Sequence, residues 1–178
     1  MSDAGYVRNR VRTTYENRWL RFEAHDIVHP NGRPGEHGVI VTPRASATVV
    51  LDGDDVILAR QARYAIDRVV LEIVKGGAEA DEDAQAAAAR ELREELGLAA
   101  ARWDPLGTVY EVPSIMQEGV SLFLAREVSA VASAPEDVET IVAVRLPFRE
   151  ALRLAGAGEI ADAVTIAALF RASRVVGP

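Results

Sequence analysis

An alanine-rich segment, residues 82–96, restricts the fold more than any other part of the sequence. It reads EDAQAAAARELREEL, and Gly97 follows directly. Alanine and leucine favour helices, and a glycine commonly ends one, so we predict a helix with Asp81 as its N-cap. At 3.6 residues per turn, one side of this helix is apolar and should face the core; it carries Ala88, Ala89, Leu92 and Leu96.

Three carboxylates flank this apolar side. Glu91 and Glu95 are four residues apart, and Glu94 borders their stripe. Like charges at this spacing cost about 0.2–0.5 kcal/mol per pair, and the negative end of the helix dipole makes their position worse. Two interpretations stay open: an acidic surface relieved by Arg90 and Arg93, or a hard divalent cation held by oxygen ligands.

Composition narrows the class of protein. The chain has 178 residues, is 49% hydrophobic and 26% charged, and carries a formal charge of -7, which fits one globular domain with a small extension. The acidic balance disfavours nucleic-acid binding, and the lack of cysteine excludes thiolate chemistry. The first residues lack the apolar core of a signal peptide, and the apolar stretch at 161–170 is too short to cross a bilayer. We therefore expect a cytoplasmic protein that does not bind membranes.

The distribution of strands and helices predicts an α/β or α+β layered domain. Residues 1–44 resemble strands and turns, and 47–60 indicate a hairpin around an Asp-Gly turn. A short buried strand should cover 69–74. Further strands are expected at 106–112, 120–125 and 141–146, and helices at 148–154 and 159–174.

The residues around the acidic helix also match a known spacing. They are Gly76, Glu82, Arg90-Glu91-Leu92, Glu94-Glu95 and Gly97-Leu98. This pattern resembles the Nudix box at all nine specified positions. The resemblance implies an α/β/α sandwich with a mixed β-sheet and an enzyme that hydrolyses nucleoside diphosphate derivatives with Mg²⁺, for which Mn²⁺ is a possible substitute.

The same resemblance implies a metal site. Its expected ligands are the carboxylates of Glu91, Glu94 and Glu95 and the backbone carbonyl of Lys75. Arg90 and Glu82 match positions that orient the ligands, which metal sites generally need. Metals on a diphosphate neutralise its charge and favour in-line attack by water, which a carboxylate base activates.

Other segments resemble the ADP-ribose pyrophosphatase branch of the family. Gln61-Ala-Arg63-Tyr64 and Leu71-Glu72-Ile73 match it, and the resemblance implies that Arg63 contacts substrate phosphates and that Glu72 lines the site. Val74-Lys75 departs from the branch, which usually has Pro-Ala before the box glycine. The branch pairs through its N-terminal sheet, so we expect 1–44 to be an antiparallel β extension that forms a homodimer and 45–178 to be the hydrolase domain, with the box at 76–98.

Two residues are candidates for the catalytic base. In the branch that the sequence resembles, the base can come from an acidic loop before the last strand. The resemblance therefore makes Glu139 the first choice, although an exposed acidic turn would look the same. Glu118, in the loop before the 120–125 strand, is the second. The three histidines lack the spacing of metal ligands and are assigned no chemistry.

The leading hypothesis is hydrolysis of ADP-ribose or another nucleoside diphosphate sugar to a nucleoside monophosphate and a sugar phosphate. Within the family, the alternatives are dinucleoside polyphosphates, GDP-mannose and NADH. From other classes, the alternatives are a nucleotide-sensing Nudix module without turnover, and a structural protein whose acidic helix serves only assembly.

Overall fold

The structure is a computed structural model that describes residues 4–132 and 141–177. Its chain forms two compact units. Met1–Pro43 and Tyr110–Gly119 make up the first unit. Arg44–Val109 and Val120–Pro178 make up the second. The loop 110–119 therefore belongs with the N-terminal strands, although 66 residues separate it from Pro43 in the sequence.

The first unit is built on a three-stranded antiparallel sheet. One set of alternate side chains carries an ion cluster, in which Arg12 pairs with Asp26 and Glu36. The other set brings His25 directly opposite His37. The strands, in their order across the sheet, are β1 (Val7–Glu16), β2 (Arg21–Val28) and β3 (Pro34–Val41).

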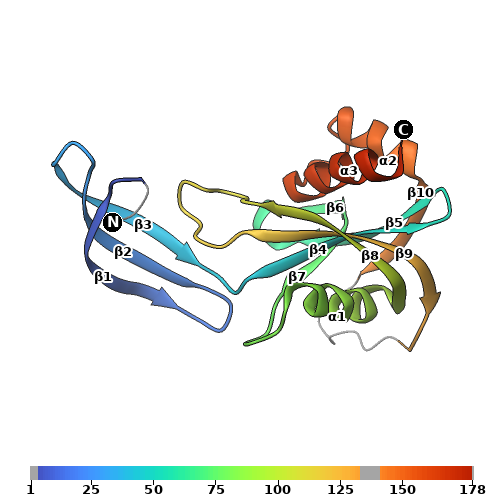
Figure 1. Cartoon of the computed structure of the whole chain (residues 1–178), viewed down its shortest axis with the longest axis horizontal. Helices are drawn as coiled ribbons and strands as arrows, with labels where there is room; N and C mark the ends of the chain where they lie inside the picture. Colours follow the sequence, from blue (N-terminus) through green and yellow to red (C-terminus); the bar gives the residue numbers. More distant parts are fainter. Residues whose placement is uncertain (1–3, 133–140, 178) are drawn as a thin grey trace. The chain divides into compact units, whose positions relative to one another are not determined.

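The second unit is built on a mixed seven-stranded sheet (Figure 1). β4 and β9 are parallel, and the other pairs in the sheet are antiparallel. The central order is β10-β5-β4-β9-β8, with β6 beside β5 and β7 beside β4. The strands are β4 (Ala45–Asp52), β5 (Asp55–Arg63), β6 (Arg68–Glu72), β7 (Val74–Gly77), β8 (Leu98–Val109), β9 (Val120–Ala130) and β10 (Val142–Pro147).

Helices cover both faces of this sheet. In Figure 1, α1 (Ala84–Leu96) lies below the sheet, and α2 (Phe148–Gly156) and α3 (Ala163–Val176) lie above it. A short 3-10 turn, η1 (Tyr64–Ile66), joins β5 to β6. The expectation of a layered α+β domain is confirmed. Within the described ranges, no helix has both the length and the apolar character that crossing a membrane requires.

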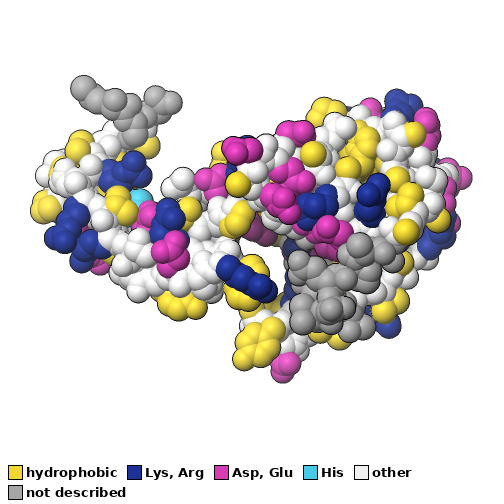
Figure 2. All heavy atoms as spheres, turned by 90° about the horizontal axis from the view of Figure 1, so that it is seen from below, with side chains coloured by type: hydrophobic (Ala, Val, Ile, Leu, Met, Phe, Trp, Pro, Cys, Tyr) yellow, Lys and Arg dark blue, Asp and Glu magenta, His cyan; other side chains and the backbone are white. Residues whose placement is uncertain are grey.

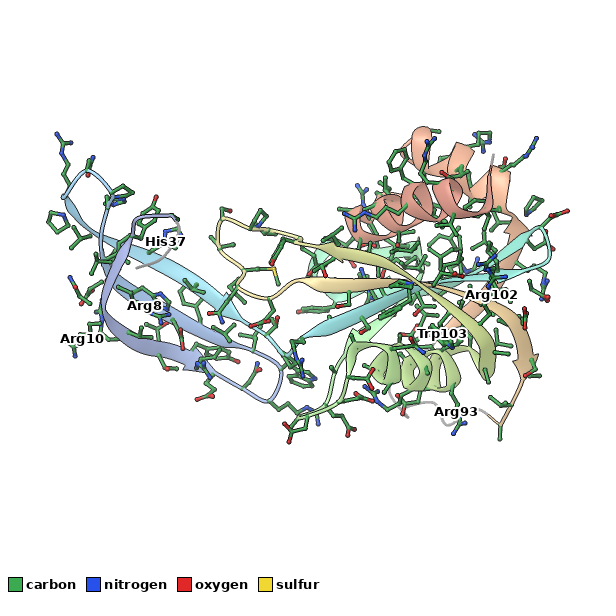
Figure 3. The ribbon with its side chains drawn as sticks, viewed as in Figure 1. Arg8, Arg10, His37, Arg93, Arg102 and Trp103 are labelled. Atoms are coloured by element: carbon green, nitrogen blue, oxygen red, sulfur yellow. The ribbon has the colours of Figure 1, made fainter. Side chains whose placement is uncertain are left out.

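The side chains of β4 alternate between two apolar clusters, one on each face of the sheet. Val49 and Leu51 pack in the larger apolar cluster, which includes residues of α2 and α3. Val50, between them, packs on the other side with Leu92 of α1. Successive strand side chains point to opposite faces, so one apolar strand supplies both layers. Trp103 of β8 joins the α1 side, as Figure 3 shows.

The acidic helix forms, with two corrections to its expected details. Its N-cap is Asp83, whose side chain accepts hydrogen bonds from Gln85 N and Ala86 N. Asp81 instead has φ of 65° and lies in the preceding turn. The buried helix residues are Ala87, Ala88 and Leu92, whereas Ala89 is exposed. Gly97 ends the helix in the left-handed region, where its missing Cβ avoids strain.

Other boundaries also differ from the sequence-based expectation. The strand expected at 69–74 is divided at Ile73, so β6 pairs with β5 and β7 pairs with β4. The last helix begins after Asp162, which caps it by accepting a hydrogen bond from Thr165 N. Four residues of the expected helix, from Glu159 onward, therefore precede it. The strand β8 starts directly after Gly97, well before the expected residue 106.

Candidate active site

The candidate site begins where β7 meets α1. A Cβ built on Gly76 would lie 2.1 Å from the Cδ atom of Glu91. No side chain other than hydrogen fits at this contact, so the glycine gives the Glu91 carboxylate its place against the β7 backbone.

Arg90 is the centre of the ion pairs on this face of the sheet. Its Nη1 donates to Glu91 Oε1 at 2.8 Å and to Glu94 Oε2 at 2.9 Å. Its Nη2 donates to Glu82 Oε2 at 3.1 Å and to the carbonyl oxygen of Gly77 at 2.7 Å. One guanidinium thus holds three carboxylates and ties the helix to the loop before it.

These contacts shift the pKa values of the groups that make them. The hydrogen bond to Glu82 is the largest contribution that raises the pKa of Arg90, and it outweighs the lowering effect of burial. The pKa of Glu82 is lowered, first by the hydrogen bond from Arg90 and then by the backbone N–H of Glu79. Arg90 and Glu82 are therefore both ionised at neutral pH.

A second set of ion pairs occupies the opposite face of β7. Arg63 binds Glu72 with two nitrogens, Nε to Oε1 at 3.1 Å and Nη2 to Oε2 at 2.7 Å. The Lys75 Nζ atom lies 3.1 Å from Glu72 Oε2 and 2.6 Å from Asp162 Oδ1. Thr165 donates to Asp162 Oδ2 through its backbone N at 2.8 Å and its hydroxyl at 2.6 Å. These contacts join β5, β6 and β7 to the start of α3.

Asp162 is ionised within this second set. Burial alone would raise its pKa, but the hydrogen bonds from Lys75 and Thr165 and the charge of Lys75 together lower it. The Glu72 side chain is only 4% exposed. Glu72 is thus held by the cations of Arg63 and Lys75, and Asp162 is held by Lys75 and by donors of Thr165 in α3.

The sequence of this chain is similar to the sequences of known proteins. The model of the NUDIX domain family matches residues 41–169. This chain belongs to the Nudix family. The matched range contains both sets of ion pairs, and the enzyme is a Nudix pyrophosphohydrolase.

Relatives give more detail on the branch. The Nudix chain is 31% identical to an ADP-ribose pyrophosphatase of Bacillus subtilis (strain 168), over 81% of this chain and 80% of the relative. It is 32% identical to an ADP-ribose pyrophosphatase of Mycobacterium tuberculosis, over 71% and 63% of the two chains. It is 25% identical to a methanol dehydrogenase activator of Bacillus methanolicus, over 90% and 88%. The resemblance to the ADP-ribose pyrophosphatase branch is thereby confirmed.

A solved structure supports the fold. The crystal structure of an ADP compounds hydrolase matches with a TM-score of 0.86 at 23% identity, covering 96% of this chain and 94% of the other. This likeness confirms the mixed sheet and helical layers expected of a Nudix fold.

The residues of this Nudix box fit a divalent cation by their chemistry. Glu91 and Glu94 present carboxylate oxygens, which hard cations prefer, and Gly76 provides the space that one of them needs. Glu95 lies half-buried one turn after Glu91. Among residues 4–132 and 141–177, no group of three or more histidine or acidic side chains is arranged so that it could hold a metal. Two of the oxygens that a cation would need contact Arg90 instead.

The structure places the two candidate bases differently. Glu118 is in the 110–119 segment of the first unit, where its Oε1 accepts a hydrogen bond from Gln117 Nε2 at 3.2 Å. Glu139 lies outside the described residues.

Sequence reasoning missed two features of this Nudix chain. The first is the Lys75 side chain, because the family resemblance implies a role only for the backbone carbonyl of this residue. The second is a cavity of ≈ 1020 Å³ in the first unit, lined by all three histidines together with Tyr6, Arg8 and Ser114. His37 Nε2 donates to the Ser114 carbonyl oxygen at 2.7 Å; Figure 3 labels His37 and Arg8. The register that pairs β2 with β3 sets His25 opposite His37, and His29 directly follows β2. A spacing rule along the sequence cannot show this.

Proposed function

We propose that the enzyme hydrolyses ADP-ribose or another nucleoside diphosphate sugar. Two ADP-ribose pyrophosphatases are among its relatives, each above 30% identity. The observation that carries the proposal is the paired arrangement around β7, where acidic groups of the box lie on one face and the Arg63–Glu72 pair lies on the other.

In the proposed reaction, water attacks one phosphorus of the diphosphate and the bridging P–O bond breaks. The products from ADP-ribose are AMP and ribose 5-phosphate, and the proton of the attacking water passes to a carboxylate base. We propose Glu139 for this base, with Glu118 as the alternative.

We propose that Glu91, Glu94, Glu95 and the carbonyl oxygen of Lys75 hold Mg²⁺, or Mn²⁺ in its place. When bound, such an ion neutralises diphosphate charge, which the acidic box cannot do by itself. Arg90 orients the carboxylates, because its guanidinium contacts two of them directly. Arg63 binds the phosphates, and Glu72 fixes the position of Arg63.

The charge of the second unit's surface agrees with this division of roles. Figure 2 views the molecule from the side on which α1 lies in Figure 1, and acidic and basic side chains are interspersed over the second unit there. A substrate with two phosphates would be repelled by the acidic groups alone, so its binding depends on local cations.

Product analysis tests the proposed function. The enzyme is incubated with ADP-ribose, a dinucleoside polyphosphate, GDP-mannose and NADH, each with Mg²⁺ or Mn²⁺, and the products are separated by chromatography. We expect AMP and ribose 5-phosphate from ADP-ribose, at a higher kcat/KM than for the other compounds. No cleavage of any of the four compounds would refute the proposal, and faster cleavage of another would reassign the substrate.

We also propose a homodimer that forms through residues 1–44. The three strands of the first unit expose large apolar side chains, among them Val7, Val11 and Tyr15 on β1. Exposed groups of this kind are a common feature of contact surfaces. Sedimentation at micromolar concentration should give twice the 19.2 kDa mass of the chain; a 19.2 kDa species alone would refute the dimer.

A further inference from the structure

Lys75 is the only lysine in the chain. All the remaining residues among the 20 lysines and arginines are arginines. The exception is the residue directly before the box glycine, and its side chain is only 18% exposed. Where a chain uses arginine so consistently, a single half-buried lysine indicates that the position requires the shape of an ammonium group.

The contacts of Lys75 explain that requirement. Its Nζ atom lies between Glu72 Oε2, at 3.1 Å, and Asp162 Oδ1, at 2.6 Å. An ammonium is a compact charge whose three N–H groups can point toward two carboxylates on different elements. A guanidinium is larger and planar and holds its five donors in a rigid fork, so it needs more room than a compact ammonium at a position that is only 18% exposed.

Lys75 and Arg63 share one oxygen of Glu72. The Glu72 Oε2 atom is 2.7 Å from Arg63 Nη2 and 3.1 Å from Lys75 Nζ. Along this row the charges alternate, from Arg63 through Glu72 and Lys75 to Asp162. The four side chains therefore carry two charges of each sign, and removal of Lys75 would leave the row negative.

We infer that Lys75 is a positioning residue that acts through Glu72 and keeps Arg63 available to the diphosphate of the substrate. This inference rests on the proposed function, because it requires Arg63 to bind phosphate. Lys75 shares the negative charge of Glu72, so Glu72 attracts Arg63 less strongly than it would alone. Without Lys75, Glu72 neutralises Arg63 more completely, and an anionic ligand meets a site with excess negative charge.

The first experiment replaces Lys75→Met, which keeps the length of the side chain and removes its charge. Affinity for ADP-ribose is measured by calorimetry without divalent ions, and KM and kcat are measured with Mg²⁺. We expect affinity to fall about tenfold, the size of one charge-assisted contact, and KM to rise more than kcat falls. Unchanged affinity and KM would overturn the inference. The matched control is Arg153→Met, which also removes one cation. Arg153 is exposed and pairs with Glu150 of α2 and with Glu159, which follows α2. This variant should change neither the affinity nor KM.

A double variant separates positioning from stability. Lys75→Met leaves Asp162 without its cation, so the protein should also melt earlier. Adding Asp162→Asn removes that charge and keeps a good N-cap for α3. We expect the double variant to regain melting temperature while its affinity for ADP-ribose stays weak. Recovery of affinity together with stability would overturn the inference, because the effect would then come from Asp162 alone.

Inorganic pyrophosphate distinguishes this inference from the proposed function. It carries the diphosphate without a nucleoside, so its binding does not depend on which sugar nucleotide is the substrate. Weaker pyrophosphate binding in Lys75→Met than in the Arg153→Met control supports the inference even if ADP-ribose is not cleaved. Equal binding in the two variants overturns it even if ADP-ribose is cleaved.

Discussion

The two faces of β7 hold ion pairs of different composition. On the α1 face, the single guanidinium of Arg90 contacts three carboxylates. On the α3 face, two cations and two carboxylates alternate. Gly76 and Lys75 are neighbours on the strand, so adjacent residues serve the two clusters on opposite sides of the sheet.

The difference in net charge indicates that the two clusters bind ligands of opposite charge. An excess of negative charge attracts a cation, and carboxylate oxygens suit a hard one. A balanced row has no such excess, but it holds an arginine that is one-third exposed and suited to phosphate. Adjacent residues of a short strand thus belong to a candidate cation site and to a candidate anion site, and the proposed metal-dependent reaction on a diphosphate uses both.

The largest expected effect is a loss of activity when an acidic residue of the Nudix box is replaced. Glu95→Gln removes a proposed ligand charge and should lower metal-dependent kcat/KM by more than about 100-fold, beyond what loss of a merely supporting group costs. The melting temperature should stay close to wild type. Glu150→Gln, an exposed residue of α2, is the matched control. A variant that melts earlier with unchanged activity would show that Glu95 serves only the fold.

Arg90→Lys tests whether the fork of the guanidinium matters as well as its charge. A lysine cannot contact Glu82, Glu91, Glu94 and the Gly77 carbonyl at once, so the carboxylates should lose their fixed orientation. We expect Mn²⁺ affinity, measured by electron paramagnetic resonance, to fall about 10- to 100-fold. Wild-type affinity in this variant would exclude an orienting role for Arg90.

Gly76→Ala tests the space beside Glu91. The added methyl group would lie within 2.4 Å of both Glu91 carboxylate oxygens, so that side chain must move. We expect about a tenfold loss of Mn²⁺ affinity, corresponding to about 1.4 kcal/mol. Gly156→Ala is the control, since an added Cβ there meets nothing within 4 Å and alanine favours the helix. Equal metal affinity in the two variants would contradict the proposed role of Gly76.

The smallest expected effect concerns Asp162, on the α3 face of β7, and is measured as a change in melting temperature. The pKa of Asp162 is lowered in the folded protein, so its contribution to stability is present above its unfolded pKa and is lost as pH falls through the lower folded value. Asp162→Asn should therefore melt about 2–4 °C below wild type at pH 7, for a loss of about 1 kcal/mol. The difference should shrink as the solution is acidified below about pH 4. A difference that is constant with pH would assign the effect to packing.

Sequence patterns predicted the parts that depend on local spacing. The hairpin between β4 and β5 forms as expected, and Gly97 ends α1. The N-cap was misplaced by two residues because several acids occur at the start of that helix, and only backbone geometry selects Asp83. Glu159 precedes α3 for a similar reason, since helix periodicity continues past the true cap.

Long-range contacts could not be predicted in this way. The row from Arg63 to Asp162 spans 99 positions of sequence, and no periodic pattern links its ends. The membership of 110–119 in the first unit likewise depends on pairing, as in the bridge between Ile40 and Met116. A count of lysines would have drawn attention to Lys75, but not to its two partners.

The confinement of all three histidines to the first unit has a consequence for titration experiments. Imidazole is the side chain whose ordinary pKa lies closest to neutrality, and every such ring in this chain belongs to the unit without the Nudix box. Proton resonances of the imidazoles therefore report on the N-terminal strands alone. Among the side chains of the second unit, a group that governs the rate near pH 7 would then have to be a residue such as a carboxylic acid whose ionisation has been moved far from its usual range.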